Sequence, residues 1–316
     1  IACHDVDTVF EAIRNLRVRG APAIGVAAAY GLITGLGDHE NEHEFDLVSQ
    51  RAAKLRVARP TAVNLHWAIN RMMGCAERLR NEGSRNFLNA LESEAQEIHR
   101  EDIAACQAIG EAGLPVVRAN PRLITHCNAG ALAVSGIGTA LAPIYLAHHE
   151  GIAVHVYVSE TRPLLQGSRL TAWELERAGV PMTLVTDNMP ATLMARGRVD
   201  GVIVGTDRVA ANGDVANKIG TLNLAILCRY YGLPFYVACP LSTLDPDTAS
   251  GNDIEIEQRA DSEVTHFGGQ ASAPVGVNVF NPAFDITPAD LVTAIITDKG
   301  ILHAPYDASI AALTGK

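Results

Sequence analysis

The sequence predicts an α/β protein in which a helical N-terminal domain is followed by a Rossmann-like domain with a mostly parallel sheet. Two patterns support this prediction. Apolar residues recur at helical spacing in the first third of the chain, and from about residue 115 short apolar runs alternate with segments of helix length. A repeated succession of strand, helix and strand is typical of parallel sheets, whose strands need crossover connections. The expected domains are residues 1–115 and 116–316.

The N-terminal domain is expected to consist of helices. Its first apolar residues recur on one face of a helix, at Val6, Val9, Phe10, Ile13 and Leu16. Residues 23–36 are small and apolar, as in a tightly packed helix. Residues 62–80 and 86–112 are predicted to form longer helices.

The second domain is expected to contain the strands. Six short apolar runs are the candidates: Leu123–Thr125, Ala153–Val158, Thr183–Val185, Gly201–Val204, Phe235–Ala238 and Val275–Phe280. Segments long enough for a helix separate most of these runs, so the strands can lie parallel in one sheet.

The composition excludes several classes of protein. Hydrophobic residues make up 48% of the 316 residues and charged residues 19%, which supplies a full core and argues against a disordered chain. The 25 Lys and Arg residues stand against 35 Asp and Glu residues, so the net charge is −10. An acidic surface argues against nucleic acids and anionic membranes as partners.

Cysteine usage and hydropathy indicate the compartment. The six cysteines have no tight spacing pattern, so we expect free thiols in a reducing compartment, the cytoplasm. The chain begins at Ile1 without a signal-peptide pattern. The uncharged residues 128–147 contain three glycines and a proline, so we expect a buried helix with its approach loop rather than a membrane span.

Polar or reactive side chains follow five of the predicted strands. Because ligands bind at the carboxyl ends of parallel strands, we expect one crevice that gathers these residues. They are His126, Cys127 and Asn128; Ser159, Glu160, Thr161 and Arg162; Asp187 and Asn188; Asp207 and Arg208; and Cys239, Pro240, Ser242 and Thr243.

Two of these residues are candidates for catalysis. Cys127 precedes a stretch of small residues that we expect to be helical, and a helix N-terminus there would stabilise a thiolate or receive a phosphate. The alternative is a small buried thiol. Asp207 follows the apolar run Gly201–Gly205, where burial would raise its pKa and suit it to act as a general acid. The alternative is a turn cap or a pair with Arg208.

Three further segments are candidates for binding an anion. Residues 207–220 are predicted to form a turn that opens a helix, and this turn carries Asn217 and Lys218. Arg19 and Arg59 are the other candidates. The alternatives are ordinary turn chemistry and solvated surface arginines.

Two motifs are set aside. Residues 39–43 match the zinc pattern H-E-x-x-H, but they lie in an acidic stretch with almost no apolar residues, so we expect no metal site. Residues 136–138 contain Gly-Ile-Gly without the third glycine of the dinucleotide fingerprint, so nucleotide binding has little support.

Six blocks of the sequence together resemble the methylthioribose-1-phosphate isomerase family. They are RGAPAIGVAAAYG (19–31), RPTAVNLHWA (59–68), THCNAGALA (125–133), ETRPLLQGSRLTAWEL (160–175), DRVAANGDVANKIGT (207–221) and NPAFDITPADLVTAIITDKG (281–300). The wider superfamily includes ribose-1,5-bisphosphate isomerase and the regulatory subunits of translation initiation factor 2B.

The resemblance implies an aldose–ketose isomerase of methionine salvage that converts 5-methylthioribose 1-phosphate to 5-methylthioribulose 1-phosphate. It implies a homodimer that uses neither a metal nor an organic cofactor. The family's catalytic residues fall on Cys127 and Asp207. Its substrate-binding residues fall on Arg19, Gly20, Ala21, Arg59, Gln166, Asn217 and Lys218.

The chain departs from the family pattern at Ser159, Thr206 and Pro190, where Asp, Ala and Ala are common in the family. These differences concern fine specificity rather than the reaction type. The resemblance also leads us to expect an N-terminal segment before residue 1.

Two other functions fit the same resemblance. One is isomerisation of another sugar 1-phosphate, either ribose 1,5-bisphosphate or 5-deoxyribose 1-phosphate, although the acidic balance of the chain weakly disfavours a second phosphate. The other is a non-catalytic regulatory subunit akin to translation initiation factor 2B. The presence of both Cys127 and Asp207 favours catalysis.

Overall fold

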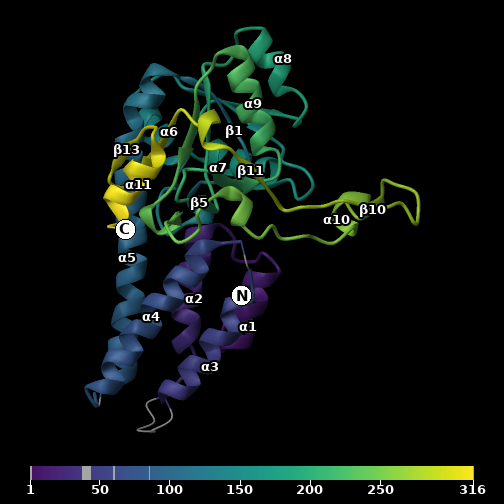
Figure 1. Cartoon of the computed structure of the whole chain (residues 1–316). Helices are drawn as coiled ribbons and strands as arrows, with labels where there is room; N and C mark the ends of the chain where they lie inside the picture. Colours follow the sequence, from purple (N-terminus) through teal and green to yellow (C-terminus); the bar gives the residue numbers. More distant parts are fainter. Residues whose placement is uncertain (1, 38–43, 60, 85, 316) are drawn as a thin grey trace.

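A sheet flanked by helices occupies one end of the molecule and a bundle of helices occupies the other (Figure 1). The computed structural model describes residues 2–37, 44–59, 61–84 and 86–315. The H-E-x-x-H motif at residues 39–43 lies outside the described residues.

The described residues of the N-terminal part form five helices, and these confirm the predicted helical pattern. They are α1 (Val6–Arg14), α2 (Ala21–Ile33), α3 (Glu44–Arg56), α4 (Val63–Asn81) and α5 (Phe87–Ala119). The 33 residues of α5 span about 50 Å. This helix therefore packs against α2 and α4 in the bundle and continues to the sheet, where it contacts α6 and β12. The predicted boundary between residues 115 and 116 falls inside α5.

The central sheet has seven strands in the order β13-β12-β7-β4-β1-β2-β3. The strands are β1 (Arg122–Thr125), β2 (His155–Ser159), β3 (Met182–Val185), β4 (Gly201–Val204), β7 (Phe235–Ala238), β12 (Ala294–Thr297) and β13 (Gly300–Leu302). Every pair is parallel except β12 with β13, which confirms the mostly parallel sheet. The order runs outward from β1 in both directions, so the topological switch point lies between β1 and β4.

Helices cover both faces of this sheet because its side chains alternate between two apolar clusters. Leu123 and Ile203 pack in the cluster that includes α5, α6 (Ala142–His149) and α7 (Ala172–Arg177). Their neighbours Ile124 and Val202 pack in the opposite cluster. The helices of that second cluster are α8 (Pro190–Ala195), α9 (Thr221–Tyr231) and α11 (Tyr306–Thr314).

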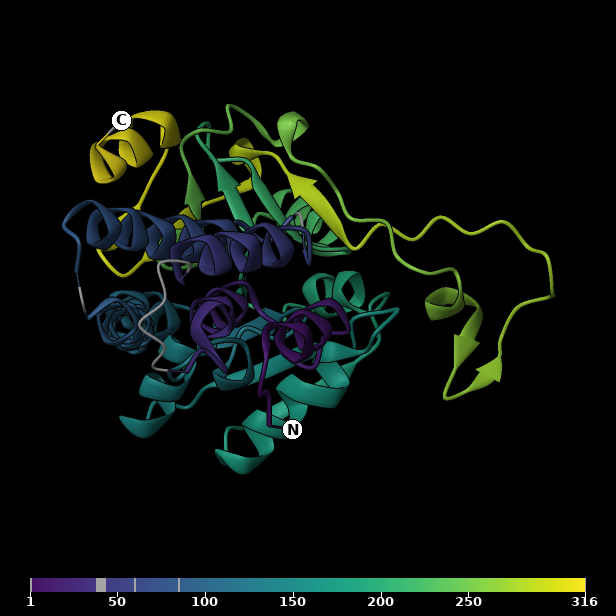
Figure 2. The same ribbon diagram turned by 90° about the horizontal axis from the view of Figure 1, so that it is seen from below.

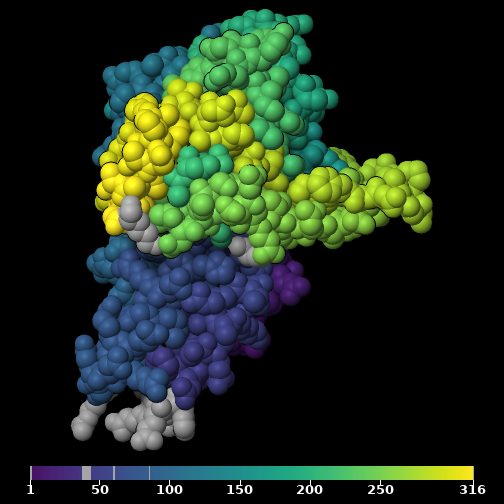
Figure 3. All heavy atoms as spheres, viewed as in Figure 1, coloured from purple at the N-terminus to yellow at the C-terminus, as the bar shows by residue number. Residues whose placement is uncertain are grey.

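A second, four-stranded sheet lies beside the first in the order β11-β6-β5-β8. Its strands are β5 (Arg208–Ala210), β6 (Val215–Lys218), β8 (Leu244–Asp245) and β11 (Phe284–Thr287). Between β8 and β11 the chain forms an arm that projects from the body (Figures 1 to 3). The arm carries α10 (Ser262–Thr265), β9 (His266–Phe267) and β10 (Gln270–Ala271). Short helical turns complete the fold: Ala131–Ala133, Gly167–Thr171, Leu241–Thr243, Gly251–Asp253 and Ala289–Leu291.

Of three local predictions, one was wrong, one was right in part and one is confirmed. Val275–Phe280 is not a strand, because it lies in the arm, where Val275 is fully exposed and has no neighbouring strand to pair with. Within residues 207–220, β5 and β6 form a hairpin instead of a simple turn, and the end of the segment leads into α9 as predicted, with Gly220 as its N-cap. Residues 128–141 form a loop and the buried helix α6 starts at Ala142, which confirms the predicted helix with its approach loop.

None of the helices in the described part of the chain combines the length and apolar character needed to cross a bilayer.

Two glycines in helices have opposite surroundings and test the packing. A Cβ atom added to Gly113 of α5 would lie 2.9 Å from Cβ and Cγ of Pro143, whereas one added to Gly74 of α4 would meet nothing within 4 Å. We expect Gly113→Ala to lower the free energy of unfolding by about 1–3 kcal/mol through overpacking. Gly74→Ala should raise it by about 0.5–1 kcal/mol, because alanine is the better helix former. Urea unfolding measures both, and a loss of stability in Gly74→Ala would contradict the structure.

Candidate active site

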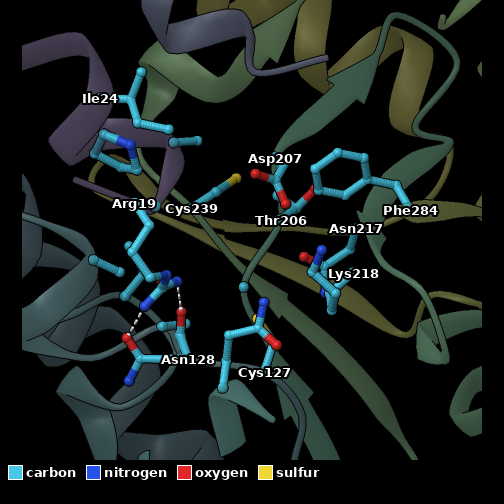
Figure 4. Close-up of a pocket in the computed structure, with 18 of the residues that line it drawn as sticks. Arg19, Ile24, Cys127, Asn128, Thr206, Asp207, Asn217, Lys218, Cys239 and Phe284 are labelled. Atoms are coloured by element: carbon cyan, nitrogen blue, oxygen red, sulfur yellow. Dashed lines mark hydrogen bonds between the residues drawn. The ribbon is translucent and has the colours of Figure 1, made fainter. Parts of the chain in front are cut away.

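A cavity lies at the carboxyl ends of β1, β4 and β7, next to the switch point of the sheet, and encloses about 760 Å³ including its open mouth. The start of α2 and the segment before α4 close it from the side of the helical bundle. All nine residues that the sequence analysis assigned to the site line it: Arg19, Gly20, Ala21, Arg59, Cys127, Gln166, Asp207, Asn217 and Lys218. Figure 4 shows Arg19 with Asn128 on one side of this cavity and Asn217 with Lys218 on the other.

Only three of the five polar strand ends reach the cavity. The residues after β1, β4 and β7 line it, but those directly after β2 and β3 do not. Asp187, which follows β3, instead accepts hydrogen bonds from the backbone N–H groups of Thr161 (2.8 Å) and Arg162 (2.6 Å). Ser242 faces away from the site and accepts a hydrogen bond from Asn64 Nδ2 (2.8 Å). These groups shape the loops around the cavity.

Cys127 occupies a constrained backbone position immediately after β1. Its φ of 61° lies in the left-handed region, which costs a non-glycine residue about 1–3 kcal/mol. Its N–H donates to Thr161 Oγ1 (2.8 Å) and its carbonyl accepts from Thr171 Oγ1 (2.6 Å), so hydrogen bonds hold both sides of the residue. The predicted helix N-terminus next to Cys127 is absent, and the ammonium of Lys218 supplies the neighbouring positive charge instead.

The carboxyl of Asp207 is half-buried and lies near several positively charged side chains. Burial raises the pKa of its carboxyl, while the nearby charges of Lys218, Arg59 and Arg19 oppose that rise. The backbone N–H of Asp207 donates to the Ala216 carbonyl (3.0 Å), which ties the residue to β6. Burial likewise lowers the pKa of Lys218, so both groups are pushed toward their neutral forms.

The positively charged side chains around the cavity are held in place by contacts with other groups of the protein. Arg59 pairs with Glu257 at 2.7 Å, and Arg259 pairs with the same carboxylate at 2.8 Å. Burial alone would raise the pKa of Glu257, but the two arginines lower it. Lys218 Nζ donates to the Ala283 carbonyl (2.9 Å) and lies 4.5 Å from the centroid of the Phe284 ring. The site therefore presents several fixed cations to a bound anion.

The start of α2 adds backbone donors. Gly20 is the N-cap residue, no side chain caps the helix, and Gly20 and Ala21 both line the cavity. Free N–H groups in the first turn of a helix favour anions. Glycine is required at position 20, because its φ is 92° and an added Cβ would collide with the backbone of Ala133.

Some residues of the site were not found by reasoning from residue types. Gln166 came only from the resemblance, and the structure buries it with its Oε1 atom unpartnered. Arg259 also lines the cavity, but it lies at the base of the arm and no local pattern marks it. Among the described residues, no group of three or more His, Cys, Asp or Glu side chains is arranged to hold a metal ion.

A parallel-sheet fold with a cationic cavity and a half-buried acid near its switch point defines a protein that binds a small anion. Comparison with known proteins narrows this class. The chain belongs to the initiation factor 2 subunit family, whose model matches residues 17–304. The predicted resemblance is thereby confirmed.

Individual relatives cover nearly the whole chain. A methylthioribose-1-phosphate isomerase from Chloroflexus aurantiacus is 54% identical and is matched over 99% of this chain and 91% of its own length. A 5-deoxyribose 1-phosphate isomerase from Moorella thermoacetica is 51% identical over 97% of this chain and 88% of its own length. The crystal structure of 5-methylthioribose 1-phosphate isomerase from Pyrococcus horikoshii superimposes with a TM-score of 0.89, at 42% identity over 98% of this chain and 88% of that one.

Substitution of Asp207 by Asn tests the burial of its carboxyl. Because the folded-state pKa is raised, the ionised carboxylate costs stability above that pKa, and the cost disappears as the pH falls toward the ordinary value of 3.8. Asn is neutral at every pH. We therefore expect the stability gained in Asp207→Asn to grow as the pH rises from about 4 to about 9.

Urea unfolding of both proteins across this range measures the difference. Burial raises the pKa of Asp285 to about 6, but this residue is present in both proteins and cancels. A difference that did not change with pH would contradict the raised pKa.

Proposed function

We propose that this chain is an aldose–ketose isomerase that converts 5-methylthioribose 1-phosphate to 5-methylthioribulose 1-phosphate, a step of methionine salvage. The proposal rests on one observation: the thiol of Cys127 and the half-buried carboxyl of Asp207 line the same cavity as several fixed cations. The predicted enzyme class agrees with the names of relatives that share about half of the sequence.

The phosphate of the substrate is assigned to the cationic part of the cavity. Arg19, Arg59 and Lys218 supply positive charge, and the first N–H groups of α2 supply neutral donors. Asn217 and Gln166 supply amide groups for the sugar hydroxyls. Held in this way, the furanose ring presents its reacting carbons to Cys127 and Asp207.

Asp207 acts as the acid that opens the ring. The anomeric oxygen of the substrate carries the phosphate, so a free aldehyde cannot form without losing it. Protonation of the ring oxygen instead breaks its bond to C1 and leaves C1 electron-poor. A carboxyl with a raised pKa keeps its proton to a higher pH than an ordinary aspartate does, which suits the role of an acid.

Hydrogen then moves from C2 to C1, while the C2 hydroxyl becomes the ketone and gives its proton to the Asp207 carboxylate that ring opening left behind. By one route Cys127 removes a proton from C2 and returns a proton to C1. By the other route the hydrogen passes directly as a hydride. A reaction in D₂O distinguishes them, because exchange of the thiol with solvent would place deuterium at C1, whereas a hydride shift would retain protium.

The assay that tests the proposal follows 5-methylthioribose 1-phosphate by phosphorus and proton NMR. The unaltered protein should produce a ketose 1-phosphate. Cys127→Ser and Asp207→Asn should each lower kcat by about 100-fold or more, because each removes a group that takes part in proton transfer.

Cys3→Ser is the matched control, since Cys3 is also a half-buried thiol but lies in the helical bundle. Its turnover should stay near that of the unaltered protein. Near-normal activity in Cys127→Ser or Asp207→Asn would remove the role assigned to that residue.

A second candidate substrate is 5-deoxyribose 1-phosphate, the substrate in the name of a 51% identical relative. It lacks the sulfur but keeps the ring and the phosphate, so the same site can take it. Comparing kcat/KM for both sugars, and for ribose 1,5-bisphosphate, ranks them. No turnover of any of the three would favour a regulatory role.

The homodimer and the cytoplasmic location stay predictions. The reaction proposed here needs no cofactor, because the acid, the base and the phosphate-binding groups are all side chains or backbone groups of the protein.

A further inference from the structure

Glu174 on α7 is a buried carboxylate that no step of the proposed reaction uses. It is 6% exposed and is not among the residues that line the cavity. Four donors surround it: Asn128 Nδ2 (2.9 Å), the N–H groups of Leu132 (3.0 Å) and Ala131 (2.7 Å), and the hydroxyl of Tyr145 (3.1 Å). A buried carboxylate is costly unless such donors satisfy it, so an arrangement this complete indicates a defined role.

Glu174 fixes the orientation of the Asn128 amide. An ionised carboxylate only accepts hydrogen bonds, so the NH₂ group of Asn128 must face it. The same Nδ2 also donates to Thr171 Oγ1 (3.1 Å). The Oδ1 atom of Asn128 is thereby turned toward Arg19 and accepts a hydrogen bond from it.

Asn128 in turn fixes Arg19. The two terminal nitrogens of the guanidinium donate to the side-chain oxygen and to the backbone carbonyl of Asn128, the second at 2.8 Å (Figure 4). Two of the five N–H donors are used, and three remain for a ligand. A flexible arginine that is already held in place loses less conformational entropy when an anion binds.

Asn128, the hydrogen-bond partner of Arg19, is neutral, so it leaves the positive charge of Arg19 uncompensated. Among the residues that the structure describes, Arg19 forms no ion pair. A hydrogen-bonded path leads from Arg19 through the Asn128 amide to the Glu174 carboxylate, which does not contact Arg19 itself. An aspartate at position 128 would hold the guanidinium equally well but would neutralise it.

The same segment also holds the backbone of Cys127. The hydroxyl of Thr171 donates to the Cys127 carbonyl (2.6 Å) and accepts from Asn128. Thr171 and Glu174 are three residues apart, at the junction of the turn Gly167–Thr171 with α7. One element therefore sets both the cation that faces the ligand and the loop that carries the thiol.

We propose that Asn128 and Glu174 are positioning residues that hold the guanidinium of Arg19 toward the phosphate of the bound sugar while leaving its charge unneutralised. This inference rests on the proposed function, since it takes Arg19 to bind the phosphate. It adds two residues that act through Arg19 rather than through contact with the reacting carbons.

The experiment compares KM, kcat and the Kd for inorganic phosphate in Asn128→Ala, Glu174→Gln and the unaltered protein. We expect both substitutions to raise KM and the phosphate Kd by about tenfold or more, with kcat changed by less than about threefold, because phosphate binding is weakened and the acid is untouched. Calorimetry gives the phosphate Kd independently of turnover.

Tyr145→Phe is the matched control. It removes another hydrogen bond to Glu174 but leaves Asn128 and Arg19 in place. Urea unfolding should show a loss of stability in this variant, while KM and the phosphate Kd stay unchanged. A rise in KM equal to that of Asn128→Ala would mean that general loosening of the loop is responsible, and would overturn the proposal.

The double variant Asn128→Asp with Glu174→Gln tests whether the Asn128–Glu174 pair acts by supporting the fold or by leaving the charge of Arg19 unneutralised. It restores a donor–acceptor pair between the two side chains with reversed polarity, so it should be more stable than Asn128→Asp alone. Its KM should remain raised, because the new carboxylate neutralises Arg19. Recovery of a normal KM would overturn the proposed role of charge.

Arg19→Gln, measured in parallel, distinguishes a failure of the role proposed for Arg19 from a failure of the positioning proposed for Asn128 and Glu174. If Arg19→Gln leaves KM and the phosphate Kd unchanged, the proposed role of Arg19 itself is wrong. If Arg19→Gln raises both and Asn128→Ala does not, Arg19 binds phosphate without help and only the positioning proposal fails.

Discussion

The docking of the helical bundle onto the carboxyl edge of the sheet is the constraint on which the rest of the site depends. The ion pair of Arg59 with Glu257 and the bonds of Asn64 to Ser242 (2.8 Å) and Thr243 (3.0 Å) lie in this contact. Arg59, Asn64 and Thr243 are buried there. The long helix α5 runs through both parts and reinforces it. Through this docking the start of α2 comes to lie over the ends of β1 and β4, so the cavity has a cationic wall opposite the strand ends. The sheet alone would supply only Cys127, Asp207 and their neighbours.

Enclosure by two parts of the chain explains the electrostatics of the site. Burial favours the neutral forms of both Asp207 and Lys218, which raises the pKa of the first and lowers that of the second. Each also feels the opposite charge of the other, which works against that shift. Groups held between their charged and neutral forms suit proton transfer, and the same arrangement costs stability. Other groups of the protein keep the cations in place: Glu257, which does not line the cavity, pairs with Arg59, and the Ala283 carbonyl accepts a hydrogen bond from Lys218.

The loop after β1 illustrates how the fold maintains an unfavourable backbone conformation. Cys127 and Thr161 both have positive φ values, and each is tied down by hydrogen bonds from a different element. Asp187, at the end of β3, fixes Thr161, which accepts a hydrogen bond from Cys127, while Thr171 fixes the Cys127 carbonyl. Polar residues at strand ends that do not reach the cavity thus support those that do. Their place in the sequence resembles that of the lining residues, and their function differs.

The sequence by itself determined the class of fold, five of the seven strands of the central sheet and the two candidate catalytic residues at strand ends. These features depend on local periodicity and on the chain direction of each strand, both of which can be read without knowing what packs against what. Only the tertiary structure decided that VANK (215–218) is a strand, that Val275–Phe280 is not, and that Asp187 lies outside the cavity. The same is true of Arg259 and of the chain of contacts from Glu174 to Arg19. Such features depend on contacts between segments far apart in sequence, for which no local pattern of residues provides a signal.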